Sequence, residues 1–200
     1  MRFVALALAI AWLTGCASTE IVGYSDPAYQ SASYTETVVH AQNVGLAKAA
    51  DLEGDICQEL SAKGINCRPF QSLFPPTRGH SADSVFQALQ KQGIGSLIIL
   101  SPSGDYSSSS TFGYQSFGSA NAVGGQVSAS SSTVPMTAFS RQSHMRILVV
   151  DAKAREVAWM GDAKTEGQGL ANTTDSAFMS SLSKSVAQEL SATPHFSGGD

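Results

Sequence analysis

The chain has 200 residues, of which 42% are hydrophobic and 14% are charged, and its formal net charge is −4 at pH 7. This length fits a single domain that buries enough apolar surface to be stable without disulfides. The hydrophobic share and the small net charge exclude a chain that is disordered throughout. The negative net charge argues against a nucleic-acid partner, which selects for a basic surface.

The N-terminus has the order of a secretory signal. Arg2 precedes an apolar run over residues 3–13, which is too short to span a bilayer. The run Leu13-Thr14-Gly15-Cys16 follows and resembles the lipobox of bacterial lipoproteins. This resemblance implies that residues 1–15 are a signal peptide and that Cys16 receives a diacylglycerol group on its thiol and an acyl chain, such as palmitate, on its new amine.

The residue after the cysteine bears on the location of the protein. Ala17 stands where an aspartate would retain a lipoprotein of Gram-negative bacteria in the inner membrane, so the resemblance implies anchoring in the outer membrane. Two or three acyl chains give a stable anchor. The alternative is an ordinary secretory signal followed by an incidental cysteine.

Two further cysteines, Cys57 and Cys67, lie ten residues apart. A secreted chain reaches a compartment that permits disulfides. Cys57 falls in an expected helix and Cys67 in the next expected strand, and a helix packed back on that strand brings the two within bridging distance. We expect a structural disulfide, with two buried free thiols as the alternative. A metal site is least favoured, because neither a C-x-x-C pair nor clustered histidines accompany them.

The first half of the chain alternates strand and helix patterns. Residues 16–33 are polar and indicate a lipidated tether, with a short strand at 20–24 as an option. Strands are expected at 34–42, 65–70 and 94–101, the last being the most apolar and placed at the sheet centre. Helices are expected at 46–63 and, after an N-cap at Ser81, up to residue 92; Gly64 and Gly93 suit their C-terminal ends. In the first helix we expect Glu53, Asp55 and Glu59 on the solvated face.

The second half has a different order. Residues 144–151 and 156–165 predict an antiparallel hairpin. Residues 174–190 predict a final helix with one apolar face, and residues 193–200 predict a flexible tail. The predicted fold is a single α/β (α+β) sandwich domain over residues 34–192. Three helices pack on a mixed, mostly antiparallel sheet, and an uncharged β-meander or loop is inserted.

The insertion covers residues 106–140, which contain no charged side chain and many serines and glycines. Three interpretations remain open. The first is an extended β-meander or a mobile loop. The second is an oligomerisation edge that adds strands to a neighbour. The third is a hairpin that enters the outer membrane together with those of other chains. Phe112 and Tyr114 alternate with polar residues, as do Val134, Met136 and Ala138, but residues 126–133 offer little apolar surface to lipid.

A search for catalytic or cofactor-binding patterns finds little. The glycines lack the spacing of a nucleophile elbow or a phosphate-binding loop, and we expect no catalytic residue, cofactor or metal. The four histidines, His40, His80, His144 and His195, are scattered along the chain. Trp159 is expected to pack under the sheet.

The C-terminal half carries a second resemblance. The hairpin written Asp151-x7-Trp159-x-Gly161, followed by Glu166-Gly167 and an amphipathic helix, looks like small α/β lipoproteins of bacterial envelopes. More distantly, the order of elements resembles the periplasmic domains of secretion and polymer-export lipoproteins such as the curli secretion channel. The resemblance implies a non-enzymatic assembly role and carries over no catalytic residue. The long uncharged insertion departs from it, because its strands do not clearly match the membrane hairpins of the pore proteins.

The leading hypothesis is a non-enzymatic lipoprotein of the outer membrane that faces the periplasm as a structural or assembly component. Its partner would be an envelope protein or a second copy, bound through residues 106–140. One alternative is a ligand- or glycan-binding module, which requires a concave pocket with exposed rings such as Tyr106, Tyr114 or Trp159. Another is a subunit of an oligomeric secretion or export ring. A hydrolase would require His80 or His144 within reach of a serine and a carboxylate.

Overall fold

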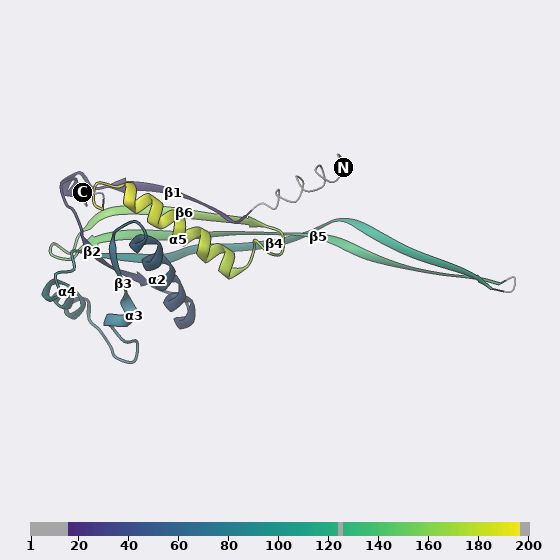
Figure 1. Cartoon of the computed structure of the whole chain (residues 1–200), viewed down its shortest axis with the longest axis horizontal. Coiled ribbons are helices and arrows are strands. Elements are labelled where there is room, and N and C mark those ends of the chain that lie inside the picture. The colour runs from purple at the N-terminus through teal and green to yellow at the C-terminus, as the bar shows by residue number, and fades with distance from the viewer. Residues whose placement is uncertain (1–15, 124–125, 197–200) are drawn as a thin grey trace, which may run out of the picture.

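The structure is a computed structural model that describes residues 16–123 and 126–196 (Figure 1). Six strands form one sheet in the order β1-β6-β5-β4-β2-β3. The strands are β1 (Ser18–Ser25), β2 (Glu36–Ala41), β3 (Asn66–Pro69), β4 (Ser96–Val123), β5 (Gln126–Asp151) and β6 (Val157–Gln168). The helices are α2 (Leu46–Ser61), α3 (Phe70–Leu73), α4 (Ala82–Lys91) and α5 (Asp175–Ala192), with a 3-10 turn η1 (Pro27–Tyr29).

Strand pairing confirms the mixed sheet. β2 pairs in parallel with β3 and with β4, whereas β4–β5, β5–β6 and β6–β1 are antiparallel. The parallel pairs follow from the strand–helix–strand order of the first half, because each helix returns the chain to the starting edge. The predicted antiparallel hairpin of the second half is β5–β6. The expected apolar strand at residues 94–101 forms the first part of β4, which lies inside the sheet between β5 and β2 as expected.

Two apolar clusters lie on opposite faces of the sheet. On one face, α2 and α5 lie side by side and bury the larger cluster against the sheet (Figure 1). Its fully buried members include Ile56 and Leu60 of α2, Val186 and Leu190 of α5, and Ile98, Ile147 and Val149 of the sheet. The smaller cluster packs Val85 and Leu89 of α4 against Val38, Leu97 and Val150. Because side chains alternate along a strand, Ile98 and Leu97 belong to different clusters.

The three predicted helices are present, and their ends follow local rules. Ser81 caps α4 by accepting a hydrogen bond from the Ser84 N–H at 3.2 Å. Gly64 and Gly93 follow α2 and α4 with φ of 81° and 74°, a conformation that glycine adopts without strain. The four-residue α3 is an additional helix in the connection between β3 and α4.

The two ends of the domain differ from the expectation. Residues 18–25, expected within a polar tether, form β1 and pair with β6 over their whole length. Thr19 and Ile21 point toward α5, and the Thr19 hydroxyl lies 2.8 Å from that of Ser181. At the other end, residues 193–196 are not a flexible tail, because His195 and Phe196 are buried against Tyr34. Residues 197–200 of the expected tail lie outside the described residues.

Candidate functional site

The uncharged insertion is one long antiparallel hairpin that projects beyond the sheet, rather than a meander or a loop (Figure 1). β2 pairs with β4 as far as Leu100, and β6 pairs with β5 as far as Ser140. Past these points, residues 109–123 pair with residues 126–139. Within the described chain, neither outer edge of this hairpin has a partner strand. Free edges of this length are templates for pairing with another chain.

The hairpin also exposes large apolar side chains. At least a third of the surface of each of seven such residues is accessible: Tyr106, Phe112, Tyr114, Phe117, Val134, Met136 and Phe139. A water-soluble surface seldom gathers so many rings on one projecting element, and such patches mark contact sites. The sequence signal for this site was the absence of charge between Asp105 and Arg141.

The pairing register separates two faces of the hairpin. Directly opposed residues share a face, and successive residues alternate. One face, here called the hydroxyl face, carries Ser109, Thr111, Ser116, Thr133 and Thr137. The other, called the apolar face, carries Phe117, Val134, Met136 and Ala138. Two contacts agree with this assignment: the Ser116 and Thr133 hydroxyl oxygens lie 3.1 Å apart, and Met136 lies beside Gly113.

The separation has exceptions. Tyr114, Pro135 and Phe139 share the hydroxyl face, and Ser110, Gln115 and Ser132 share the apolar face. A register shift between Thr111 and Gly113 leaves Phe112 as an extra residue of β4. The alternation of Phe112 and Tyr114 seen in the sequence therefore does not place Tyr114 with Val134 and Met136.

A charged network closes the base of the hairpin. Arg141 donates two hydrogen bonds to Asp105 and one to Asp175 of α5, and its guanidinium lies 4.7 Å from the centre of the Phe178 ring. Lys48 of α2 pairs with the same Asp175 at 2.5 Å. The hydrogen bond from Lys48, then that from Arg141, holds the pKa of Asp175 below its ordinary value. The hydrogen bonds to Asp105 and Asp175 raise the pKa of Arg141 above its ordinary value.

A pocket of about 130 Å³ lies beside this network. Its lining includes all four charged residues of the network and apolar side chains, among them Leu52, Met145, Phe178 and Leu182. Pockets that enclose a small organic ligand measure about 300–1,000 Å³. The pocket is therefore small for a ligand-binding module. Trp159 is buried as expected, and Tyr106 and Tyr114 lie on the hairpin, so these three rings do not gather around one cavity.

The predicted lipid-anchor residue lies level with the base of the hairpin. Cys16 is exposed and stands two residues before Ser18, the first residue of β1. Ser18 pairs with Glu166 of β6, Glu166 pairs with Gln142 of β5, and Gln142 pairs with Tyr106 of β4. Figure 1 shows the start of β1, in purple, on the side from which the hairpin projects.

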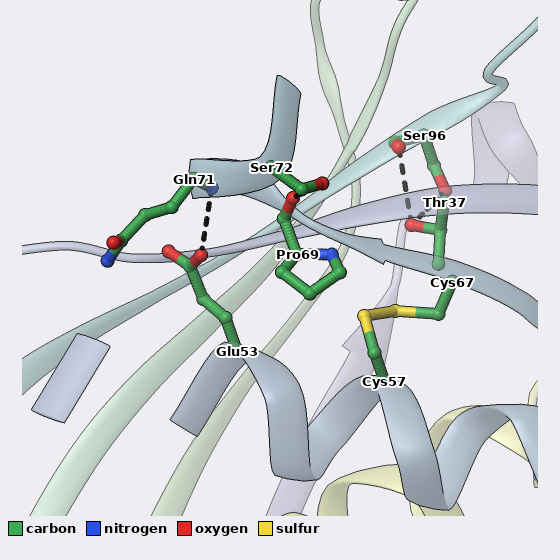
Figure 2. The surroundings of a disulfide bond; sticks show 8 residues. All are labelled: Thr37, Glu53, Cys57, Cys67, Pro69, Gln71, Ser72 and Ser96. Atoms are coloured by element: carbon green, nitrogen blue, oxygen red, sulfur yellow. Dashed lines mark hydrogen bonds between the residues drawn. A yellow bond between two sulfur atoms is a disulfide. The ribbon is translucent and has the colours of Figure 1, made fainter. Parts of the chain in front are cut away.

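The expected disulfide joins Cys57 of α2 to Cys67 of β3, with the two Cα atoms 4.9 Å apart (Figure 2). Glu53 lies one turn earlier on α2, and its placement on a solvated face was wrong: it is fully buried. Its carboxylate accepts hydrogen bonds from the backbone N–H groups of Ala41 at 3.0 Å and Gln71 at 3.1 Å, which explains the burial. Of the other two acids, Asp55 is exposed and Glu59 is partly so.

The histidines are dispersed through the fold. His80 Nε2 lies 3.1 Å from the carbonyl oxygen of Pro75, and the His144 ring meets Tyr106 edge-on at 6.2 Å. His40 Nδ1 lies 3.3 Å from the Glu53 carboxylate, and His195 stacks on Tyr34. Within residues 16–123 and 126–196 there is no group of three or more His, Cys, Asp or Glu residues that could hold a metal ion. In the same part of the chain, no helix has the length and apolar character needed to cross a membrane.

Known proteins resemble this chain weakly. No protein-family model and no curated protein matches it. Among solved structures, the PelC dodecamer from Paraburkholderia phytofirmans shares 13% identity, over 89% of this chain and 98% of that chain, at a TM-score of 0.45. The lipoprotein GNA1162 from Neisseria meningitidis shares 11% identity, over 78% and 98%, also at 0.45. These values are too low for any function to be transferred.

The site therefore rests on this chain's own features. Sequence reasoning located the uncharged segment but missed the network at its base. Asp105 and Arg141 are the two charged residues that border the segment, and this bracketing was the available signal. No sequence signal pointed to Asp175 or Lys48 as their partners, because these residues reach the base only through the packing of α5 and α2.

Proposed function

We propose that this chain is a non-enzymatic structural subunit of a multi-copy assembly in the bacterial envelope. A lipid on Cys16 anchors it in the outer membrane, with the domain in the periplasm. The observation that carries the proposal is the projecting hairpin, whose two outer edges have no partner strand within residues 16–123 and 126–196. Copies associate edge to edge through these hairpins, so that the β4 edge of one copy pairs with the β5 edge of the next.

The backbone of the hairpin supports this mode of association. Each outer edge presents a row of N–H and C=O groups, and natural proteins usually protect such edges with charges, prolines or covering elements. Between residues 106 and 140 there is no charge, and Pro135 is the only proline. The edge protection that a monomer needs is thus largely missing, which favours a partner strand. Because the two edges of one hairpin are different, each copy offers both halves of the contact, and copies can close into a ring.

The body of the domain supports a structural role in a different way. The charged network at the base fixes the hairpin to both α2 and α5, so the hairpin is held in one orientation relative to the core. The Cys57–Cys67 disulfide fits an oxidising compartment such as the periplasm. An assembly subunit needs a hairpin with a fixed orientation, because a hairpin that changes its orientation does not bring its edges into register with those of a neighbour.

The test is the mass of the lipidated protein after extraction in mild detergent, measured by light scattering with the detergent contribution subtracted. A multi-copy species of defined mass is expected. The matched control replaces residues 109–139 by Asn-Gly, so that Ser108 and Ser140 flank a two-residue turn. This variant retains the pairing of the sheet and should be monomeric. The proposal would be contradicted if the unmodified protein were a strict monomer. It would also be contradicted if the control contained the same number of copies as the unmodified protein.

The lipid anchor has its own test. Mass spectrometry of the mature protein should find an N-terminal Cys16 that carries acyl chains, and Cys16→Ser should release the chain from the membrane fraction. An unacylated mature N-terminus would contradict the proposed lipid anchor. It would not contradict the association of the hairpins, which is tested separately by the mass in detergent.

A further inference from the structure

The hairpin has the dimensions of a membrane-crossing element. The strand segments 107–117 and 129–139 each contain eleven residues, and a spanning strand needs about 9–11 residues. At about 3.3 Å per residue, each segment covers about 36 Å, against a hydrocarbon thickness of about 30 Å. Neither segment contains a charged residue. The last charges before the hairpin, Asp105 and Arg141, neutralise one another at its base.

The position of Cys16 sets the direction of the membrane. The pairing Ser18–Glu166–Gln142–Tyr106 places the N-terminal end of β1 level with the start of the uncharged segment. Acyl chains on Cys16 hold that level of the domain at the membrane surface, because only Ala17 separates Cys16 from β1. The hairpin projects from the same end of the sheet (Figure 1). A membrane that receives the acyl chains therefore lies in the path of the hairpin.

From this geometry we infer that the hairpin inserts into the same bilayer that holds the acyl chains of Cys16. The inference rests on the proposed lipid anchor and on the proposed edge-to-edge association. The apolar face, with Phe117, Val134 and Met136, contacts lipid chains. The hydroxyl face, with Ser116, Thr133 and Thr137, turns away from lipid toward the interior of the ring of hairpins.

Association and insertion require one another. In hydrocarbon, an unpaired backbone N–H or C=O group costs several kcal/mol, so a lone hairpin with two free edges does not enter lipid. A closed ring pairs every edge and removes that cost. In such a ring the apolar face, with Phe117, Val134 and Met136, meets the requirement for one face in lipid, and the other face turns Tyr114 and Phe139 inward beside its hydroxyl residues.

The serine-rich end of the hairpin does not oppose insertion. Residues 126–133 have little apolar surface, and they lie at the far end of the hairpin from the base. The lipid-facing residues Val134, Met136 and Ala138 lie nearer the base and thus nearer the anchor, and Phe117 lies level with Ser132 at the inner limit of that serine-rich end. With the lipid-facing band in this nearer part, the far end reaches water on the other side of the bilayer.

The experiment uses the lipidated full mature chain in vesicles of phosphatidylethanolamine and phosphatidylglycerol. Single cysteines are introduced on the apolar face as Val134→Cys or Met136→Cys, and on the hydroxyl face as Thr133→Cys or Thr137→Cys. A fifth variant, Gln87→Cys, places the label on an exposed position of α4 as a control. The introduced thiol is the one that reacts, since Cys16 carries lipid and Cys57 and Cys67 are bridged. Each thiol carries an environment-sensitive fluorophore.

Two quenchers then report the surroundings of each label. For labels at residues 134 and 136, nitroxides on the lipid chains are expected to quench several-fold more than they do at residue 87, and aqueous iodide to quench several-fold less. Labels at residues 133 and 137 are expected to respond to iodide and little to the nitroxides. Two positions on each face guard against one variant that fails to fold.

Other patterns would overturn the inference. If all hairpin labels respond to iodide like residue 87, the hairpin stays in water; if all are shielded from both quenchers, it is buried in protein. In either case, a multi-copy mass in detergent would leave the proposed function standing, because that measurement does not depend on insertion. A monomeric mass in detergent would contradict both the proposed function and the insertion of the hairpin.

Discussion

Asp105 and Arg141 join the two strands of the hairpin at the point where it leaves the sheet. Arg141 Nε lies 3.0 Å from Asp105 Oδ1, and Arg141 Nη2 lies 2.6 Å from Asp105 Oδ2. The same guanidinium reaches Asp175 at 2.7 Å and so connects the hairpin to α5. The two charges that border the uncharged segment in sequence are therefore partners in space, and the pair marks the boundary between domain and hairpin.

Arg141→Met should destabilise the domain by about 1–3 kcal/mol. The arginine side chain is only 18% exposed, and its loss leaves two carboxylates without their shared donor, a cost of about 1.5–3 kcal/mol for hydrogen bonds to charged groups. Urea unfolding measures the change. The control is Arg146→Met, whose pair with Asp162 is 55% and 64% exposed, so its loss should cost at most about 1 kcal/mol. Equal losses of stability for the two variants would show that the network at the base stabilises the domain no more than an exposed ion pair does.

The same network predicts a pH dependence. Lys48 and Arg141 lower the pKa of Asp175 in the folded chain, below its ordinary value of 3.8. The folded state therefore binds fewer protons there than the unfolded state does, and the stabilisation is fully present above the unfolded pKa. It is lost as the pH falls through the folded pKa, that is, below about 3.8.

The measurement is urea unfolding at several pH values between about 6 and 2.5. Asp175→Asn should be less stable than the unmodified chain near neutral pH, and the difference should shrink as the pH falls. A difference that stays constant over the whole range would mean that Asp175 does not titrate in the way its contacts indicate. Asp162→Asn, a change in an exposed pair, should show a smaller effect throughout.

Much of the fold could be predicted because local patterns and long-range packing agree. The apolar spacing of α2, α4 and α5, the cap at Ser81 and the glycines at 64 and 93 each have a local physical cause. β1 was expected only as a short optional strand, because its polar residues give little apolar signal. It is held instead by pairing with β6 and by the contact of Thr19 with α5.

The buried acid on α2 could not be predicted from spacing alone. Glu53 was assigned to the solvated face with Asp55 and Glu59, since charged residues on helices are usually exposed. Its burial depends on two backbone N–H groups that come from β2 and α3, at Ala41 and Gln71. These groups are distant in sequence and reach Glu53 only once the domain has folded.

Glu53→Ala should therefore cost about 2–4 kcal/mol, because it leaves the buried N–H group of Ala41 and the partly buried N–H group of Gln71 without an acceptor. Glu53→Gln should cost less, since the amide keeps one acceptor oxygen for one of the two donors. Asp55→Asn changes an exposed acid on the same helix and should stay within about 0.5 kcal/mol of the unmodified chain. Thermal or urea unfolding ranks the three. An alanine variant as stable as Asp55→Asn would contradict the role of Glu53 as acceptor for Ala41 and Gln71; Figure 2 shows the hydrogen bond from Gln71.

The disulfide makes a separate contribution beside Glu53. Replacing Cys57 and Cys67 together by alanine should lower stability by about 2–3 kcal/mol, the range expected for a loop of ten residues. The unmodified chain should lose a similar amount on reduction, measured by urea unfolding with and without a reducing agent. The double variant supplies the control, because its unfolding should not respond to the reducing agent. A response of the double variant would mean that reduction acts elsewhere.

Strand β1 packs over a tryptophan, and two glycines permit this. Gly23 of β1 pairs directly with Gly161 of β6, and a Cβ on either would lie 2.3 or 2.4 Å from the indole of Trp159. Gly161→Ala should therefore force the ring or β1 to move, at a cost of about 1–3 kcal/mol. Trp159 is the only tryptophan in residues 16–200, so in a protein that begins at Cys16 its fluorescence reports the packing directly.

A second glycine-to-alanine change should have the opposite effect on stability. A Cβ at Gly54, inside α2, would meet no atom within 4 Å, so Gly54→Ala should stabilise the helix by about 0.4–1 kcal/mol. Its Trp159 emission should match that of the unmodified chain, whereas Gly161→Ala should shift the emission toward the red as the indole becomes more exposed. The comparison separates a general effect of removing a glycine from the loss of space around Trp159. If Gly161→Ala leaves both stability and emission unchanged, β1 does not depend on this packing for the position of Cys16.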